Sequence, residues 1–573
     1  MSQIKEKYKQ LKPTLDYLSD PVVLAQAWKK SHSYIRSHNW YADTLELDAS
    51  AINLEANLIA WGNELSTLRY QAKPMRLVPA PKTDVWTFEK RNSHWEWRPA
   101  ATQAKLLAKR RRSQLSEPLR PLAHLTIKDQ TVATAMMMCM ADAVETAQGP
   151  TDGTNVSSFG NRLFCSWYEG RARFGWGSSN TYSKYFQDYQ RFLKRTAGAA
   201  KNLELFQTLF ATAPHAVYEV QLDMSAFYDS IDRNELLSKL RGVVDGHHGL
   251  PREETESFWN AVDRCFSSWK WSRQDSRLNS CLKIPLSNNG LPQGLVASGF
   301  FANVYLLDFD AACSALVGSS FNDFIIHDYC RYVDDLRLLI SVNENACSET
   351  LDSIKQTIVT MLGLFLPQGG SLKFNPDKTK LIRLSGEDSD VSSQMSRLQA
   401  ITSGPMDLDS LIHVENSLDS LFLRAEVVQD ESAKSAPATC PHPLATVHQI
   451  ALDVREDTVL RFAANRWAKV LKAKRRLANR SEQDALDTMQ EAVARRFIAS
   501  WARNPALTLL LKKGLQLFPS PILLRTAWEP LVEKWSNATP LRERYIASYC
   551  LAEICRLSVT DLRRTIAADL PRS

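Results

Sequence analysis

The sequence predicts an α+β fold, followed by a C-terminal region built of helices alone. With 573 residues the chain is too long for one ordinary core, which indicates two to four domains. Strand-like and helix-like stretches alternate between residues 215 and 385, as they do in an α+β domain. Beyond residue 386 the strand signals disappear, and Leu, Ala, Arg and Glu recur at helical spacing between turn signals.

The composition is typical of a folded, soluble chain, with 44% hydrophobic and 23% charged residues. The net charge of +7, from 70 basic and 63 acidic residues, is compatible with nucleic-acid binding but does not require it. The first residues lack the apolar core of a secretory signal, and no run of 18 apolar residues occurs. We therefore expect a cytoplasmic protein without a membrane partner. The ten cysteines form no CxxC pair and are expected to be reduced packing residues.

The elements expected along the chain begin with helix-like stretches and a hairpin in residues 85–99, where aromatic residues alternate with polar ones. Residues 101–118 carry five basic side chains on an expected helix, which is either a solvated face or a contact for phosphates. A helix with a methionine cluster is expected in residues 127–147. Residues 216–222 alternate as a half-buried strand does, and a helix-like run, residues 224–240, follows it.

Acidic residues stand at the ends of two of these strands. Asp334 and Asp335 lie at the turn of an expected hairpin, residues 330–340, and Asp223 ends the strand that begins at residue 216. An isolated Asp-Asp pair is usually a surface turn, but here apolar strands flank it. If the strands are neighbours in one sheet, the three carboxylates converge and require a divalent cation. Mg²⁺ prefers such oxygen ligands, and two Mg²⁺ ions are the usual arrangement for phosphoryl transfer.

These two stretches and four others resemble the motifs of reverse transcriptases, in that family's order. The palm motifs are Asp223 with Phe227 and Tyr228, then GLPQGLVASGFFAN (290–303), YVDD (332–335) and LKFNPDKTKLI (372–382). The fingers motifs are RPLAHLTIKDQ (120–130) and SFGNRL (158–163). The resemblance implies the fingers and palm of a right-hand polymerase. Residues 1–100 would form an N-terminal extension and the start of the fingers, residues 101–385 the fingers and palm, and residues 386–573 a helical-repeat-like domain in place of a thumb.

The resemblance also implies roles for individual residues. Asp223, Asp334 and Asp335 would be the catalytic metal ligands, and Lys378, or alternatively Lys380, would protonate the leaving pyrophosphate. The residues expected to contact the nucleotide are Arg120 and Lys128 at the triphosphate, Arg162 at the triphosphate or template, Phe227 beside the sugar-gate Tyr228, and Gln293 at the nucleotide or template base. A bulky ring at position 228 would clash with a 2′-hydroxyl and select deoxynucleotides, although a tyrosine there is also compatible with core packing.

Within the family, SFGNRL and the long helical C-terminal region resemble the bacterial abortive-infection and unknown-group reverse transcriptases of phage defence. The resemblance implies an RNA-directed or template-independent DNA polymerase that uses dNTPs, with a nucleic-acid template or a noncoding RNA as partner. Some relatives form homo-oligomers and attach the DNA product to a protein hydroxyl. Beyond Tyr332 the only tyrosines are Tyr545 and Tyr549, which are possible priming residues but are more often packing residues.

Three alternatives remain open at this stage. The chain could be a catalytically silent palm-fold protein that senses RNA or DNA in phage defence. It could be an RNA polymerase, although Tyr228 and YVDD disfavour that reading. The basic run of residues 460–480 is either a solvated helix surface or a guide for a DNA product or noncoding RNA.

Overall fold

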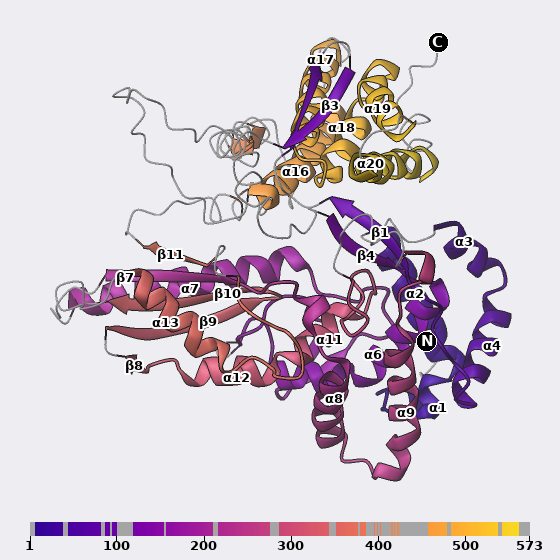
Figure 1. Ribbon diagram of the computed structural model, residues 1–573, viewed down its shortest axis with the longest axis vertical. Coiled ribbons are helices and arrows are strands. Elements are labelled where there is room, and N and C mark those ends of the chain that lie inside the picture. The colour runs from indigo at the N-terminus through magenta and orange to yellow at the C-terminus, as the bar shows by residue number, and fades with distance from the viewer. Residues whose placement is uncertain are drawn as a thin grey trace. The chain divides into compact units, whose positions relative to one another are not determined.

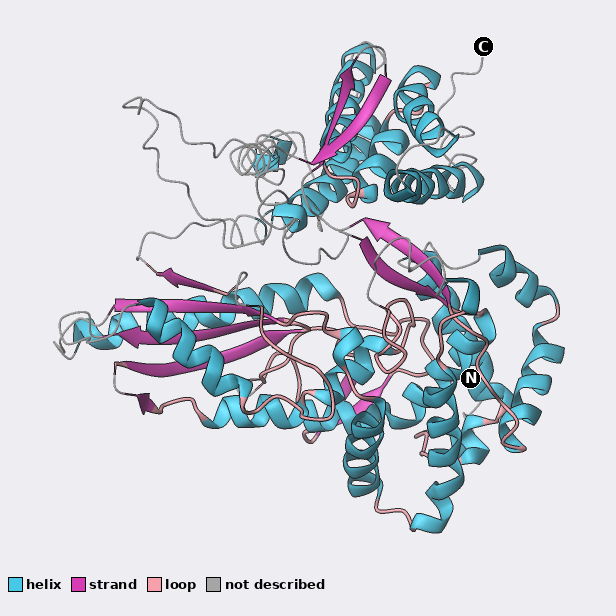
Figure 2. Ribbon diagram, in the orientation of Figure 1, coloured by secondary structure: helices cyan, strands magenta, loops and turns pink. Residues whose placement is uncertain are grey.

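The computed structural model describes most of the chain. The described residues are 6–37, 44–81, 86–91, 94–99, 119–153, 156–209, 216–275, 286–321, 323–342, 351–375, 379–384, 456–477, 483–536 and 541–560, with eight helical positions and Thr402 between 395 and 422. The α+β class is confirmed, with helices predominating (Figure 2). Among the described helices, none combines the length and the apolar character needed to cross a membrane.

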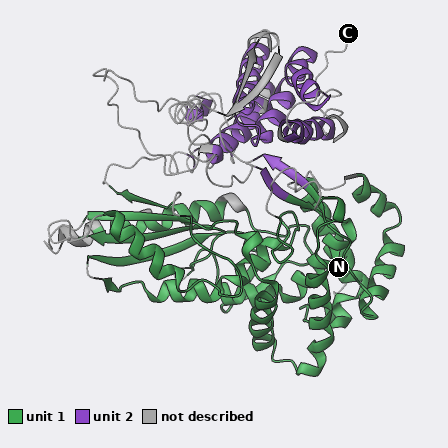
Figure 3. Ribbon diagram, viewed as in Figure 1, with its two compact units in different colours: residues 1–77, 122–276, 286–387 green, residues 78–121, 277–285, 388–573 purple. Residues whose placement is uncertain are grey.

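The chain forms two compact units (Figure 3). Unit 1 contains residues 1–77, 122–276 and 286–387, and unit 2 contains residues 78–121, 277–285 and 388–573. The chain leaves unit 1 within strand β1 (Arg76–Pro81) and returns within strand β4 (Leu119–His124). The last crossing lies two residues beyond the boundary expected at 385/386. Residues 78–121, which the sequence divides between an extension and the fingers, belong instead to unit 2.

Unit 1 contains a five-stranded antiparallel sheet (Figure 1). Its strand order is β11 (Lys380–Arg383), β7 (Ala216–Asp223), β10 (Asp335–Val342), β9 (Phe324–Tyr332) and β8 (Ser320–Phe321). Helix α7 (Tyr185–Leu209) lies along β9 and β10, α12 (Leu307–Ala315) along β9 and α13 (Leu351–Gly363) along β11. Ion pairs join α7 to the sheet: Arg195 holds Asp328 of β9 at 2.8 Å. The predicted strand ending at Asp223 and the predicted hairpin at 330–340 are thus neighbours in one sheet.

The helical part of unit 1 is arranged around α6 (Ile127–Gln148), which is apolar on nearly all sides and buried along its length. Thr126 caps its first turn by accepting a hydrogen bond from the Asp129 amide, and Gly149, with φ +74°, ends it. The remaining helices and strands of unit 1 are η1 (Glu6–Tyr8), α1 (Leu15–Leu18), α2 (Pro21–Ser37), α3 (Thr44–Ile52), α4 (Leu54–Ser66), β5 (Cys165–Tyr168), β6 (Arg171–Phe174), η2 (Tyr228–Ser230), α8 (Arg233–His248), α9 (Arg252–Ser268) and α11 (Ser298–Tyr305). One hydrophobic core includes side chains of the sheet, α6, α8, α9 and α11, so the sheet and the helices are one folded body.

The run after Asp223 differs from the helix that the sequence predicts. The chain forms a single 3-10 turn at η2, and α8 begins only at Arg233. Asp232 caps α8 by accepting a hydrogen bond from the Glu235 amide at 2.8 Å. This cap starts a new helix, so residues 224–232 can lie against the site instead of extending away from it.

Unit 2 combines a hairpin with helices. Strands β2 (Trp86–Arg91) and β3 (His94–Pro99) pair antiparallel, which confirms the predicted hairpin, and β2 lies beside α17 (Gln483–Arg503). The other helices with bounds in unit 2 are α16 (Glu456–Leu477), α18 (Thr508–Leu517), α19 (Pro521–Ser536) and α20 (Leu541–Thr560). Buried Trp467 and Trp501 are among their largest core side chains. The expected basic helix of residues 101–118 lies outside the described residues.

Basic side chains of α16 make contacts inside unit 2. Lys474 pairs with Glu415 at 2.9 Å, and Arg475 pairs with Asp487 at 3.0 Å. Arg466 donates to the Thr402 hydroxyl at 3.2 Å. These contacts give three members of the basic run a packing role within the helical unit.

Candidate active site

The backbone brings the three predicted aspartates to one end of the sheet. In the antiparallel register of β7 and β10, Asp223 lies directly opposite Asp335. The Met224 amide donates to the Asp334 carbonyl at 3.2 Å. Residues directly opposite each other place their side chains on the same face of a sheet. Residues more than a hundred positions apart in the chain therefore meet where β7 ends and β10 begins.

The type of ligand at this position fits Mg²⁺, which binds hard oxygen donors and usually takes one or two carboxylates. Asp223 is a buried residue, with 6% of its surface exposed. Among the described residues, however, no group of three or more His, Cys, Asp or Glu side chains is already gathered to hold a metal. If the three aspartates hold an ion, their side chains would have to converge when it binds.

The turn between β9 and β10 has an unusual backbone. Val333 adopts φ +59°, a left-handed conformation that is rare for a β-branched residue. Gly160 lies against it: a Cβ at Gly160 would be 2.5 Å from Val333 Cγ2 and 2.7 Å from Val333 N. The turn that carries Asp334 therefore depends on a glycine from a segment about 170 residues earlier.

Arg331 supports the same turn from inside the protein. Its side chain is fully buried, and it donates to Asp310 Oδ1 at 2.8 Å and Asp310 Oδ2 at 2.5 Å. It also donates to the Val333 carbonyl at 2.9 Å and to Ser158 Oγ at 3.1 Å. Burial alone would lower the pKa of Arg331, but the adjacent Asp310 outweighs it and raises that pKa above its ordinary value.

Tyr228 lies beside the aspartates, in the 3-10 turn η2. Its ring is 5.3 Å from that of Phe227, which is buried in the core. Asn161 Nδ2 donates to the Tyr228 hydroxyl at 3.4 Å. Burial raises the pKa of Tyr228, and the charge of Asp334 raises it further, which places the phenol within electrostatic reach of that carboxylate.

The GLPQG loop packs directly against η2. A Cβ at Gly290 would be 2.5 Å from Asp229 Cα, so only glycine fits there, and the Leu291 amide donates to the Tyr228 carbonyl at 2.8 Å. Gln293 Nε2 donates to Asp229 Oδ2 at 3.3 Å. The predicted nucleotide-contacting glutamine and the predicted gate are therefore on adjoining segments.

Buried Gln130 of α6 fixes the far end of this loop. Its Nε2 donates to the Gly294 carbonyl at 2.9 Å, and its Oε1 accepts from the Val296 amide at 2.9 Å. No local pattern in the sequence indicates this role, because both partners lie more than 160 residues away.

Residues 373–375 run beside the end of β7. The Asn375 amide donates to the Asp223 carbonyl at 2.8 Å, and the Ser225 amide donates to the Lys373 carbonyl at 2.9 Å. Lys380 is exposed at the start of β11, opposite Gln221. Lys378, the predicted proton donor, lies outside the described residues, and its role stays a prediction.

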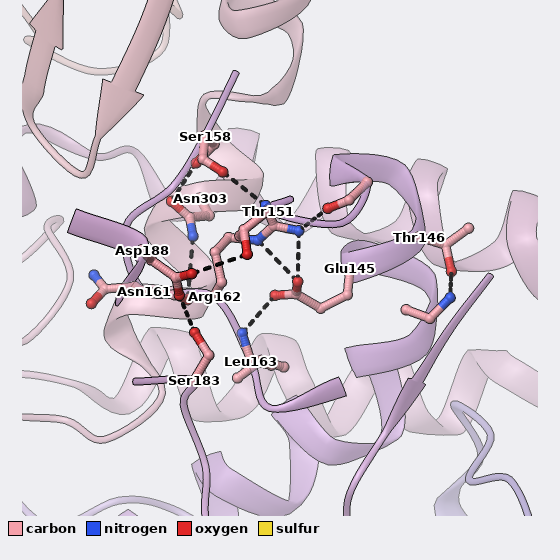
Figure 4. Close-up of polar contacts among 12 residues, drawn as sticks. Glu145, Thr146, Thr151, Ser158, Asn161, Arg162, Leu163, Ser183, Asp188 and Asn303 are labelled. Atoms are coloured by element: carbon pink, nitrogen blue, oxygen red, sulfur yellow. Dashed lines mark hydrogen bonds and ion pairs between the residues drawn. The ribbon is translucent and has the colours of Figure 1, made fainter. Parts of the chain in front are cut away.

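The other predicted basic residues occupy different surroundings. Arg162 is buried and donates to Glu145 Oε2 at 2.9 Å, to the Ser158 carbonyl at 2.8 Å and to the Gly149 carbonyl (Figure 4). Nε and both terminal nitrogens of the Arg162 guanidinium are therefore bonded to α6, to the glycine that ends α6 and to the loop 158–163. Contact of Arg162 with a template or triphosphate stays a prediction that would require these bonds to be exchanged.

The remaining predicted residues are described by their own contacts and elements. Lys128 forms an ion pair with Glu64 of the N-terminal helices, and its Nζ is 5.5 Å from the Tyr70 ring centre. Arg120 is exposed on the part of β4 that belongs to unit 2. Tyr545 and Tyr549 lie on α20 of unit 2 and are partly exposed.

Comparison with known proteins gives limited information. No family model and no curated protein matches the chain. Among solved structures, apo telomerase from Candida tropicalis aligns over 89% of this chain and 82% of that chain, at 12% identity and a TM-score of 0.31. Telomerase from Candida albicans in complex with the TWJ fragment of telomeric RNA aligns over 58% of this chain and 51% of that chain, at 14% identity and a TM-score of 0.23.

A third structure, Candida tropicalis telomerase with the same kind of RNA fragment, covers 62% of this chain and 52% of that chain at 15% identity and a TM-score of 0.21. The chain therefore spans about half the length of two of these three telomerases. These identities and TM-scores are too low to assign a fold or a function.

Proposed function

We propose that the chain is a nucleotidyltransferase of the reverse-transcriptase type, an RNA-directed or template-independent DNA polymerase that adds dNTPs. The observation that carries the proposal is the strand register that sets Asp223 opposite Asp335, with Asp334 in the adjoining turn. The ordered motifs around this register, with Tyr228 and the GLPQG loop packed beside it, support the same function.

Each residue then has a defined task. Asp223, Asp334 and Asp335 would hold two Mg²⁺ ions, which supply charge stabilisation and acidify the attacking hydroxyl when bound. The Tyr228 ring excludes a ribose 2′-hydroxyl, and Gln293 contacts the incoming nucleotide or the template base. Lys378 or Lys380 donates the proton that the pyrophosphate takes as it leaves.

The test is incubation of the purified chain with Mg²⁺ and labelled dNTPs or rNTPs, with and without primer–template. We expect dNTP incorporation that disappears in Asp334→Asn. The matched control is Asp308→Asn, because the Asp308 side chain is 79% exposed and pairs with Lys239 away from the aspartates. Incorporation of rNTPs alone would instead make the chain an RNA polymerase.

A second candidate function is a catalytically silent sensor of RNA or DNA. It is favoured by the absence of a ready-made group of three metal-ligating side chains among the described residues. It predicts nucleic-acid binding in a gel-shift assay, equal in wild type and Asp334→Asn, with no incorporation of any nucleotide.

We further propose that the activity serves bacterial phage defence, as the SFGNRL motif and the helical C-terminal region suggest. Phage plaque counts on bacteria that express the chain test this role, and protection should be lost in Asp334→Asn. Sequencing the DNA product tests whether a template or noncoding RNA is copied. Size-exclusion chromatography with light scattering tests the expected homo-oligomer.

Priming from the protein itself is a separate part of this proposal. Tyr545 and Tyr549 lie on α20 and are partly exposed, which is compatible with such a role. Label that stays with the denatured protein after nuclease trimming, and disappears when both tyrosines are changed to phenylalanine, is the expected result. Label released by denaturation and phenol extraction alone would exclude protein priming.

A further inference from the structure

Asn161 connects three parts of the candidate site that are far apart in the chain. It lies in the loop 158–163 and adopts φ +53°, a left-handed conformation that asparagine tolerates better than most residues. Its Nδ2 donates to the Tyr228 hydroxyl at 3.4 Å. Glycine would also adopt this backbone conformation, so the loop alone does not require the Asn161 amide. The amide contacts Tyr228, the side chain that is expected to select the sugar.

The position of this amide is fixed from two other directions. Gly299 of α11 leaves room for it, since a Cβ at position 299 would be 2.6 Å from both Cγ and Nδ2 of Asn161. Asn303, one turn later on α11, donates to the Gly160 carbonyl at 2.8 Å and to the Asn161 carbonyl at 3.4 Å (Figure 4). The loop backbone and the amide are thereby held in one place relative to α11.

The partner of the amide is held by other contacts as well. The Tyr228 backbone is held by the GLPQG loop through the Leu291 amide, at 2.8 Å. Its ring packs against the hydrophobic core and edge-on against Phe227, with an angle of 64° between the ring planes. The Asn161 amide adds a polar contact at the hydroxyl end of the ring.

We propose that Asn161 is a specificity-determining positioning residue, which holds the Tyr228 ring in place and so sets the discrimination between deoxyribonucleotides and ribonucleotides. The inference rests on the proposed polymerase function. The Tyr228 ring can exclude a ribose 2′-hydroxyl only if the incoming ribonucleotide does not push the ring aside. Loss of the hydrogen bond at its hydroxyl therefore lowers the preference for dNTPs over rNTPs by about 2- to 10-fold, the range expected of one hydrogen bond.

The test compares kcat/KM for a dNTP and the matching rNTP in three variants. Asn161→Gly removes the amide while keeping the left-handed backbone accessible. Tyr228→Phe removes the acceptor, and the double variant Asn161→Gly/Tyr228→Phe completes the cycle. Ser157→Ala is the control, because it removes an exposed hydrogen bond to Ser314 at 2.6 Å near the same loop without touching Tyr228.

Each single variant at Asn161 or Tyr228 should lower the dNTP preference about equally, and the double variant should lower it no further. Ser157→Ala should leave the preference unchanged, which separates this role from general loosening of the loop. Additive losses in the double variant, or an unchanged preference in Asn161→Gly, would overturn the inference while the polymerase activity stands. A wild-type chain that incorporates no nucleotide would overturn the proposed function, and the inference with it.

Discussion

The guanidinium of Arg331 joins the turn that carries Asp334 to α12 and to the loop 158–163. Since it is fully buried, removing either partner of its pair with Asp310 leaves a buried charge without compensation. We expect Arg331→Met to lower the free energy of unfolding by about 3–5 kcal/mol. Urea titration followed by tryptophan fluorescence measures this change.

The companion variants give this prediction its control. Asp310→Leu alone should cost a similar amount, and Arg331→Met/Asp310→Leu should be more stable than the sum of the two single losses, because no uncompensated charge remains. Strictly additive losses would show that the two side chains do not act as a pair.

Lys30 gives unit 1 a pH-dependent stability. Its buried ammonium donates to the Gly175 and Asn180 carbonyls at 3.0 and 2.6 Å, and burial lowers its pKa to about 7. Between this value and the ordinary 10.5, the unfolded chain binds a proton that the folded chain does not. The stability associated with Lys30 is therefore full above pH 10.5, and is lost as the pH falls toward 7.

The corresponding variant is Lys30→Met. The difference in free energy of unfolding between wild type and this variant should shift in favour of wild type by about 1–2 kcal/mol between pH 7 and pH 9. Urea titrations of both proteins at these two pH values measure it. A difference that is the same at both would mean that Lys30 stays protonated in the folded chain.

At this scale some residues of the candidate site can be picked out from the sequence and others cannot. Asp223, Asp334 and Asp335 stand out because they lie at the ends of apolar strands, where burial of a carboxylate is costly unless its charge is compensated. Asn161, Gln130 and Arg331 could not be assigned, because their partners are distant in the chain and only the fold defines them. Arg162 and Lys128 were assigned by motif position alone, and the structure gives both of them protein partners.

At the scale of the elements, the turn between β9 and β10 is packed tightly against Gly160 of the loop 158–163. A Cβ added at Gly160 would approach Val333 Cγ2 and the Val333 backbone nitrogen to 2.5 and 2.7 Å. Because backbone cannot move aside as a flexible side chain does, Gly160→Ala should displace the turn, lowering stability by about 1–3 kcal/mol. Nucleotide incorporation should fall with it.

Gly177→Ala is the matched control for this prediction. A Cβ there meets nothing within 4 Å, so its stability should stay within about 0.5 kcal/mol of wild type. Thermal unfolding and incorporation assays on both variants provide the comparison. Equal behaviour of the two alanine variants would show that the turn does not depend on close contact with the loop.

Periodicity predicted most elements correctly and missed where one of them begins. The hairpin 86–99, the buried helix of residues 127–147 and the strand ending at Asp223 follow from local patterns. The run after Asp223 was predicted as helix because its apolar spacing fits one, whereas the structure starts α8 at the Asp232 cap. The Asp232 cap can be recognised from neighbouring residues in the sequence. The packing of Gly290 on Asp229, which holds η2 in place, involves residues 61 positions apart and cannot.

At the scale of the whole molecule, the helical unit depends on a hairpin from the first hundred residues. Strands β2 and β3 belong to unit 2, and β2 lies beside α17. We expect replacement of residues 86–99 by a Gly-Ser linker to expose α17 to protease, since its neighbour is then missing. Limited trypsin digestion read by mass spectrometry measures the rate of cleavage within residues 483–503.

Unit 1 offers an internal control for this digestion. Cleavage after Lys128, the one trypsin site in α6 of unit 1, should be equally slow in wild type and in the linker variant. If α17 is cut no faster in the variant, the hairpin is dispensable for the helical unit. The sequence could not predict that residues 78–121 and 388–573 form one unit. A change in composition marks a boundary along the chain, but it does not show which distant segments pack together.

The hairpin and α17 belong to the same unit, and this has a consequence for synthesis of the protein. Pro99 ends the hairpin and Gln483 begins α17, so 384 residues separate them, from 483 − 99. A ribosome adding about 5–20 residues per second needs roughly 20–80 s to cover that distance. Throughout that interval the nascent chain carries a tryptophan-rich β-ribbon whose helical neighbour has not yet been made, which is the period when a chaperone has most to protect.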